Sequence, residues 1–268
     1  MNRLFLKEDS RKYIPERKKF KTAVCGISQG AGATTIAVTL AFLLSKNLEL
    51  CQNKNEHKLV TYVEMERPFE GRESLYTAMG FDRKFGGKIY YDWFGHMERG
   101  DAAVHRLNMY KGVNWIIHEK SAGTALINEP EYLIKAVPGT MVIADNPDAA
   151  SLENYDVIIG IINPLPGSIF AGMKTLKRIK NLEKSGHNVI WAVNCASDKV
   201  PLKKLENFLK INEYIRLPLI DGRIFYECEY LGLFWPEELM RKEDPLPLEY
   251  VKNMEILCEK VLKLYETN

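Results

Sequence analysis

A glycine-rich turn within residues 22–44 is the feature that most limits what this chain can fold into. The apolar run Ala23–Cys25 before it predicts a buried strand, and Thr34–Ser45 after it is apolar nearly all round, which is typical of a helix packed on a sheet. At the start of such a helix, unpaired N–H groups and the positive end of the helix dipole point out of the turn. Three glycines let the backbone come close to a ligand: Gly26, Gly30 and Gly32. The stretch therefore predicts a phosphate-binding strand–turn–helix unit.

The turn lacks the lysine that phosphate-binding loops normally carry. In the pattern G-x-x-x-x-G-K-[ST], a lysine precedes the hydroxyl residue, and Ala33 stands in its place here. The hydroxyl position itself is kept, because Thr34 and Thr35 follow, and Thr34 is the candidate ligand of Mg²⁺. The residues that we expect to contact the phosphates are Gly30, Ala31, Gly32, Ala33, Thr34 and Thr35.

With its flanks, the turn resembles the loop of the ParA/MinD family of deviant-Walker P-loop ATPases, which typically reads K-G-G-x-G-K-[ST]-[ST]. On that pattern Ser28 takes the position of the first lysine and Ala33 that of the second, so both lysines are missing. The resemblance implies a doubly wound, mainly parallel sheet with the ligand at the C-terminal ends of the strands, and ATP or ADP with Mg²⁺ as the cofactor. It also implies that hydrolysis is absent or very slow, because phosphoryl transfer depends on cations that stabilise the transition state.

Two acidic residues follow the next strand. Leu59–Val63 reads as a strand buried on both faces, and it ends in Glu64 and Glu66, where the family commonly has two aspartates. Carboxylates at the end of a strand can orient water or a metal, which makes both glutamates catalytic candidates. The alternative is that they bind neighbouring backbone and basic groups.

A later apolar strand also ends in an acid. Thr140–Asp145 has the layout of a Walker B strand, and Asp145-Asn146-Pro147 resembles the D-x-P of the family. The resemblance implies that Asp145 holds Mg²⁺ through water, together with Thr34. The alternative is a carboxylate that caps the next helix.

The resemblance continues toward the C-terminus in consistent order. Asn163–Ser168 resembles the family turn T/N-P-x-P-x-S, and Ser168 is expected to cap the helix that follows. Val189–Val193 predicts another strand, and the resemblance implies that Asn194 after it bonds the adenine base.

A different motif occupies the same turn. Gly26–Gly30 reads G-x-S-x-G, the nucleophile elbow of α/β-hydrolases, which would make Ser28 a nucleophile. Its position is early for such an elbow, because only about two dozen residues precede it and half of the oxyanion hole normally comes from an earlier loop. A serine hydrolase is thus the alternative from another class, and a turn that serves only packing is a further one.

Length and composition favour one cytoplasmic α/β domain. The 268 residues predict a basic leader in 1–21 and a single domain in 22–268. The net charge of +2 favours no partner class and does not indicate DNA binding. Five cysteines without a C-x-x-C pair read as reduced packing residues of a cytosolic protein, and no apolar run approaches the length of a membrane span.

These observations give one main functional hypothesis. The chain is interpreted as a degenerate ParA/MinD-like nucleotide-binding protein, a pseudo-ATPase or very slow ATPase that acts as a scaffold or positioning factor. By analogy with TadZ/CpaE-like members, the expected partners are a second copy and a protein of a positioning, envelope or pilus assembly. The alternative within the fold is an active ATPase whose cation comes from Arg67, Arg223 or a partner.

Overall fold

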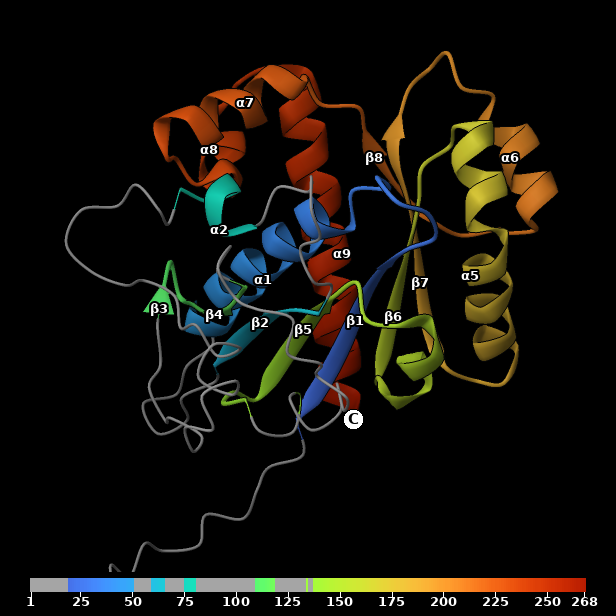
Figure 1. Cartoon of the computed structure of the whole chain (residues 1–268), viewed down its shortest axis with the longest axis horizontal. Coiled ribbons are helices and arrows are strands. Elements are labelled where there is room, and N and C mark those ends of the chain that lie inside the picture. Colours follow the sequence, from blue (N-terminus) through green and yellow to red (C-terminus); the bar gives the residue numbers. More distant parts are fainter. Residues whose placement is uncertain (1–18, 51–58, 66–74, 81–108, 119–133, 135–136) are drawn as a thin grey trace, which may run out of the picture.

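The computed structural model describes residues 19–50, 59–65, 75–80, 109–118, 134 and 137–268 (Figure 1). These residues form an eight-stranded sheet in the order β3-β4-β2-β5-β1-β6-β7-β8. All neighbouring strands in the described part of the chain are parallel except β3 and β4. The strands are β1 (Phe20–Gly26), β2 (Val60–Glu64), β3 (Met109–Tyr110), β4 (Val113–Ile116), β5 (Met141–Asp145), β6 (Val157–Ile162), β7 (Asn188–Ala196) and β8 (Ile215–Pro218). The predicted mainly parallel sheet is confirmed.

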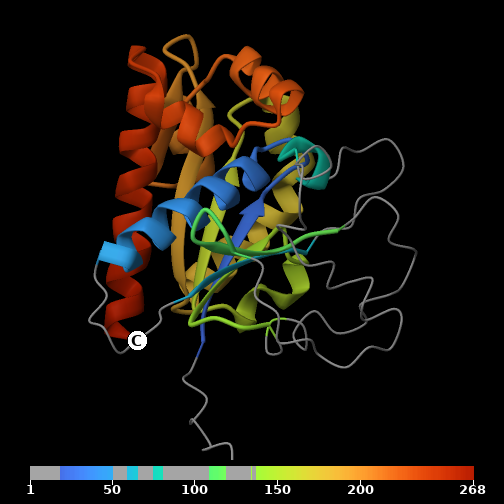
Figure 2. The same cartoon turned by 90° about the vertical axis from the view of Figure 1, so that its left-hand side faces the viewer.

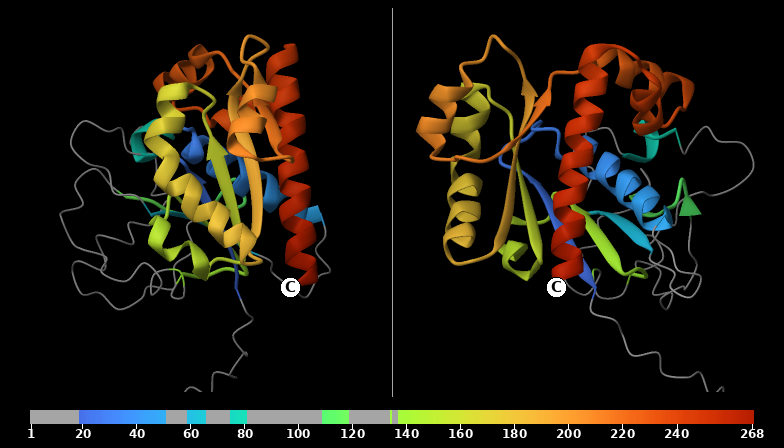
Figure 3. Two further views of the ribbon diagram at one scale, coloured as in Figure 1. Left: turned by 90° about the vertical axis from the view of Figure 1, so that its right-hand side faces the viewer. Right: turned by 180° about the vertical axis from the view of Figure 1, so that it is seen from behind.

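Helices cover both faces of this sheet. They are α1 (Ala33–Leu50), α2 (Leu75–Ala78), the 3-10 helix η2 (Ala149–Asn154), α5 (Pro166–Lys184), α6 (Leu202–Leu209), α7 (Gly222–Leu231), α8 (Trp235–Arg241) and α9 (Pro245–Thr267). Figure 3 shows α5 and α9 on opposite sides of the sheet, and Figure 2 shows α1 on the same side as α9, with which it is in contact. Two hydrophobic cores follow, one under α1, α7, α8 and α9 and one under α5, α6 and η2. No helix among the described residues is long and apolar enough to cross a membrane.

The central strands are apolar on both faces because both faces are covered. Every residue of β2, β5 and β6 is buried, which is typical of parallel strands between two helical layers. Helix α1 is buried along most of its length, in agreement with its apolar sequence. The first strand begins at Phe20, two residues before the predicted domain start at residue 22, because Phe20 already packs in the core. The predicted leader lies outside the described residues up to residue 18.

One predicted helix cap is wrong. Helix α5 begins at Pro166, and Leu165 is its N-cap residue, without a side-chain hydrogen bond. Proline suits this first position because its missing N–H has no intrahelical partner to lose. The N–H of Leu165 donates instead to Asn163 Oδ1 at 3.1 Å. Ser168, expected as the cap, therefore lies within the first turn of the helix.

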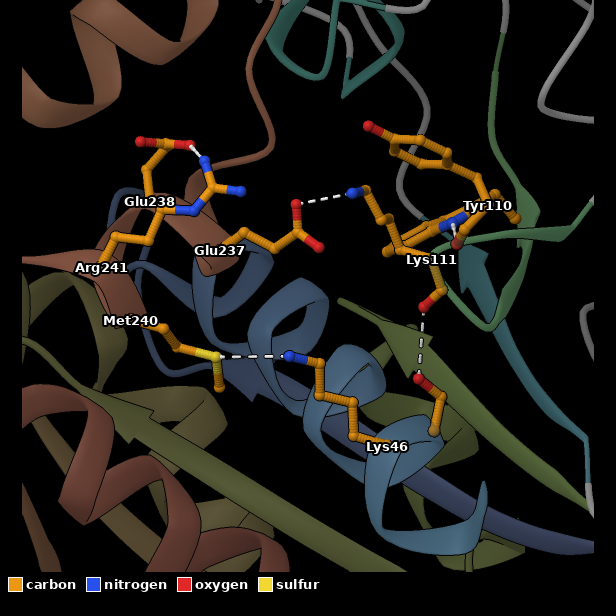
Figure 4. A network of polar contacts seen from close by, with 9 residues as sticks. Lys46, Tyr110, Lys111, Glu237, Glu238, Met240 and Arg241 are labelled. Atoms are coloured by element: carbon orange, nitrogen blue, oxygen red, sulfur yellow. Dashed lines mark hydrogen bonds and ion pairs between the residues drawn. The ribbon is translucent and has the colours of Figure 1, made fainter. Parts of the chain in front are cut away.

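The edge of the sheet at β3 and β4 is held by aromatic packing and a few polar contacts. Phe234 packs against the rings of Phe42, Tyr110 and Trp115, with centroids 5.1, 5.5 and 6.0 Å away. Figure 4 shows the polar contacts beside this cluster, among them the ion pair of Lys111 with Glu237 at 2.6 Å. Because partly exposed ion pairs contribute only about 0–1 kcal/mol, the buried rings supply most of the attachment of α8 to this edge.

Candidate functional site

The loop between β1 and α1 lies at the C-terminal edge of the sheet, next to its central strands. Strand β1 pairs with β5 on one side and β6 on the other. The N–H of Ile27 continues the pairing with β6 by donating to the carbonyl of Ile161 at 2.9 Å, and α1 opens with the N–H of Ile36 donating to Gly32 at 3.1 Å. This is the edge at which doubly wound sheets bind ligands.

Two glycines have the conformations that the loop needs. Gly30 has φ +72° and Gly32 has φ +87°, both in the region that other residues rarely adopt. A Cβ atom at Gly30 would meet nothing within 4 Å, whereas one at Gly32 would lie 2.1 Å from Asn194 Nδ2. Position 32 is thus restricted to glycine by conformation and by space, and position 30 by conformation alone.

A cavity of about 530 Å³ opens over this loop. Its lining residues are Cys25, Gly26, Ile27, Ser28, Gln29, Gly30, Ala31, Gly32, Ala33, Thr34, Asn146, Pro147, Ala149 and Thr175. This set, taken from the described residues, contains neither lysine nor arginine. The Oγ atom of Ser28 is buried, and it has no hydrogen-bond partner among the described residues. The residues present fit a phosphate group through loop N–H groups, this hydroxyl and the helix N-terminus.

The hydroxyl pair and the alanine differ in their surroundings. Ala33 is only 4% exposed and packs in the hydrophobic core, although it also borders the cavity. Thr34 is half-buried and lines the cavity, while the carbonyl of Thr35 accepts a hydrogen bond from Thr39 Oγ1 at 2.8 Å. The residue that sequence analysis assigns to Mg²⁺ is thus the threonine that faces the open space.

Asp145 lies at the end of β5, where its register partners are Val24 of β1 and Glu64 of β2. Its side chain is 2% exposed, and its Oδ2 accepts a hydrogen bond from the hydroxyl of Tyr62 at 2.7 Å. Among the described residues that line the cavity, Asn146 and Pro147 appear but Asp145 does not. The phenol of Tyr62 is a partner that the sequence analysis missed, because nothing in a strand sequence reports a contact with the neighbouring strand.

Glu64 binds backbone. Its Oε2 accepts the N–H of His118 at 2.9 Å, just beyond the end of β4, and the residue is buried. This geometry favours the backbone-binding alternative over a role in catalysis. Glu66 lies outside the described residues. No group of three His, Cys, Asp or Glu side chains among the described residues has the arrangement of a metal site.

Two asparagines hold the loop at its two ends. Asn194 is 9% exposed, and its Nδ2 donates to the carbonyl of Ala31 at 2.9 Å. Asn146 Oδ1 accepts the N–H of Gly26 at 3.1 Å. The role of Asn146 was not predicted, although an asparagine before a proline is a signal for a special backbone conformation, and its φ is +48°.

An irregularity in β7 accompanies the position of Asn194. The pairing of β7 with β8 shifts register between Val193 and Ala196, and Cys195 has φ +55°. Such bulges redirect side chains at strand ends. Burial raises the pKa of the Cys195 thiol above its usual value, which keeps the thiol neutral.

The remaining candidates are the described histidines, as a base for Ser28, and Arg223, as a cation for an active ATPase. His118 follows β4, and His187 precedes β7 at the N-terminal end of that strand, away from the loop edge. No described histidine forms the hydrogen bond to Ser28 Oγ that a nucleophile and its base require. Arg223 is ion-paired with Asp221 at 2.5 Å and borders a separate cavity.

Comparisons with known proteins show which class of fold this is. No protein-family model and no curated protein matches the chain. Among solved structures, the chain is similar to a ParA family ATPase of Chlorobium tepidum, with TM-score 0.57 and 16% identity over 88% of this chain and 98% of that one. It is similar to a plasmid partition protein of Borrelia burgdorferi bound to AMPPNP, with TM-score 0.59 and 15% identity over 93% and 99% of the two chains. It is also similar to a chain of the MinC:MinD cell division protein complex of Aquifex aeolicus, with TM-score 0.60 and 14% identity over 89% and 95%. The fold is therefore that of the ParA/MinD ATPases.

Proposed function

We propose that this chain is a ParA/MinD-like nucleotide-binding protein that binds ATP or ADP through its phosphates and hydrolyses ATP very slowly or not at all. One observation carries the proposal. Two glycines of the loop, Gly30 and Gly32, have positive φ beside a cavity of about 530 Å³, yet the described residues that line this cavity include no lysine or arginine.

Binding rests on groups that remain in place. The loop N–H groups and the first turn of α1 would contact the phosphates, and helix α1 has no acidic residue in that turn to oppose them. Thr34, which lines the cavity, would hold Mg²⁺, and the cation would offset phosphate charge. Asp145, which is buried directly before the lining residues Asn146 and Pro147, would act on the cation only through water. The borrelial relative, which is bound to AMPPNP, supports nucleotide as the ligand class.

Slow hydrolysis follows from the two substituted positions. Ser28 and Ala33 bring no positive charge to the cavity, and the loss of a transition-state cation typically lowers the rate by several powers of ten. A protein that binds but hardly turns over nucleotide is suited to act as a scaffold or positioning factor. The similarity to a chain of a MinC:MinD complex supports a protein partner, and we expect a second copy of the chain as a further one.

Calorimetric titration of the full chain with ATP and ADP, with and without Mg²⁺, tests the binding step. We expect roughly micromolar, Mg²⁺-dependent binding by the wild type and its loss in Gly32→Ala, whose new Cβ would collide with Asn194. Gly186→Ala is the matched control, because it also places an alanine at positive φ with nothing within 4 Å, at the end of α5 and outside the cavity lining, and should retain the affinity. Absence of binding by the wild type would overturn the proposal.

An assay of ATP turnover then distinguishes a protein that only binds nucleotide from an active ATPase. Phosphate release should stay close to the uncatalysed background at saturating ATP. Turnover at about 1 per second, which is ordinary for phosphoryl-transfer enzymes, would favour an active ATPase with a cation supplied from elsewhere. Labelling of Ser28 by a fluorophosphonate would instead favour the hydrolase.

A further inference from the structure

We propose that Asn194 is a positioning residue of the phosphate loop, which acts by bonding the carbonyl of Ala31. The inference rests on the proposed function, and it differs from a role in reading the adenine base. Asn194 would set the affinity for the phosphates of any ligand, whether or not that ligand carries a base.

The contact is short, buried and directed at the loop. Asn194 Nδ2 lies 2.9 Å from the carbonyl oxygen of Ala31, and Ala31 is 2% exposed. The same nitrogen fills the space beside Gly32, where a Cβ atom would lie 2.1 Å from it. The amide of Asn194 therefore lies against the loop backbone at two consecutive residues and supports the turn at its last part before α1.

The opposite end of the loop is held in a complementary way. Asn146 Oδ1 accepts the N–H of Gly26, so one asparagine binds a donor where the loop begins and the other binds an acceptor where it ends. The two side chains come from the ends of β5 and β7, which lie on the two sides of the β1–β6 pair. The loop is thus fixed from both sides by strands that do not belong to it.

Loss of the Asn194 amide would leave a buried carbonyl without this donor and a space under Gly32. A buried carbonyl without a hydrogen-bond donor destabilises the loop conformation in which it is buried. The loop would then populate other conformations, in which its N–H groups no longer point at one phosphate site. We expect the affinity for phosphates to fall about tenfold, since the penalty for one unsatisfied buried group is on that order.

The test compares two ligands that share phosphates and differ in the base. Calorimetry of the full chain with ATP and with inorganic tripolyphosphate, both with Mg²⁺, is carried out on wild type, Asn194→Ala and Asn194→Leu, which keeps the branched shape but not the donor. We expect both ligands to weaken by the same factor in both variants. If ATP weakens and tripolyphosphate does not, Asn194 reads the base and the proposal is overturned.

A matched control lies at the other end of the same strand. Asn188 is exposed, and its Nδ2 donates to the carbonyl of Asp156 at 3.1 Å, remote from the loop edge. Asn188→Ala should leave both affinities unchanged. If Asn194→Ala lowers only the melting temperature and neither affinity, its role is structural alone, which also overturns the proposal.

Amide hydrogen exchange of the ligand-free chain tests, independently of nucleotide binding, whether Asn194 holds the loop in place. We expect the amides of residues 28–33 to exchange about tenfold faster in Asn194→Ala than in wild type, with helix α5 unchanged. Equal exchange in the loop would overturn the role of Asn194. If the wild type binds neither ligand, the proposed function fails while the exchange result still decides whether Asn194 holds the loop.

Discussion

The hydroxyl of Tyr62 donates a hydrogen bond of 2.7 Å to Asp145 Oδ2 and thereby joins the middle of β2 to the end of β5. Both residues are buried, and the Tyr62 ring also packs on Trp115 with centroids 5.1 Å apart. The carboxylate proposed to act on Mg²⁺ is therefore oriented by a residue of the protein core.

Tyr62→Phe should lower the free energy of unfolding by about 1–3 kcal/mol, because a buried carboxylate loses one charge-assisted hydrogen bond while the ring packing is kept. Urea denaturation measures the change. Tyr226→Phe is the control, since Tyr226 on α7 is 71% exposed and should shift stability by less than about 0.5 kcal/mol. Equal effects of the two substitutions would contradict the importance of the Tyr62–Asp145 bond.

Ala33→Lys should supply a cation to the loop. Because Ala33 borders the cavity, the long side chain can extend into it while its stem stays buried. We expect ATP affinity to rise about tenfold and turnover to increase above the wild-type background, measured by calorimetry and phosphate release. Ala33→Met provides an unbranched side chain of similar length without charge. An identical gain in both variants would show that the charge is not what the loop lacks.

The close approach of Gly80 and Gly232 should make position 80 intolerant of a side chain. A Cβ atom at Gly80 would lie 2.6 Å from the Cα atom of Gly232, at the end of α7. Gly80→Ala should therefore lose about 1–3 kcal/mol more stability than Gly186→Ala, which also has positive φ but open space around it. Thermal unfolding of both variants checks this. A loss of equal size would mean that backbone strain alone matters at Gly80.

Alkaline pH should destabilise the protein through its buried thiols. Burial raises the pKa of Cys258 from 9.0 to about 12, although Asn47 Nδ2 donates to its sulfur at 3.5 Å. Below about pH 9 the Cys258 thiol keeps its proton in both the folded and the unfolded chain, so the free energy of unfolding does not change with pH through this group. Between about pH 9 and 12 only the unfolded chain releases the proton, so the free energy of unfolding falls as pH rises.

Cys258→Ala should reduce this slope by about 1.4 kcal/mol per pH unit within that window, as measured by urea unfolding at a series of pH values. Val261→Ala, at a buried site on the same helix, should lower stability at every pH and leave the slope unchanged. A slope in Cys258→Ala that matches wild type would show that other groups control alkaline unfolding.

The central strands and their parallel character could be predicted, because long apolar runs such as Val157–Ile162 are typical of strands that are buried on both faces of the sheet. The short strand β3 could not. Met109 and Tyr110 pair with β4 across a turn at Lys111 and Gly112, both with positive φ, and two residues are too few to show a hydrophobic period.

The strand–turn–helix unit of the candidate site could be predicted from the sequence, but the contacts of the side chains around it could be predicted only in part. Glycines and threonines mark the loop because local conformation and helix geometry require them. The direction of the Asn194 side chain depends instead on the irregular pairing of β7 at Cys195, which is a property of two strands together. The contact of Tyr62 with Asp145 likewise depends on strand order, which no single segment encodes.

The bonds from Asn146 and Asn194 to the loop backbone have a consequence for how the loop responds to its solution conditions. A cradle made of main-chain groups, held by neutral amides, keeps its shape when the charged residues around it are exchanged. In this chain the shape of the turn is thus expected to depend on two amides from flanking strands and on no charged side chain, so salt and pH should change ligand affinity without changing the conformation of the turn.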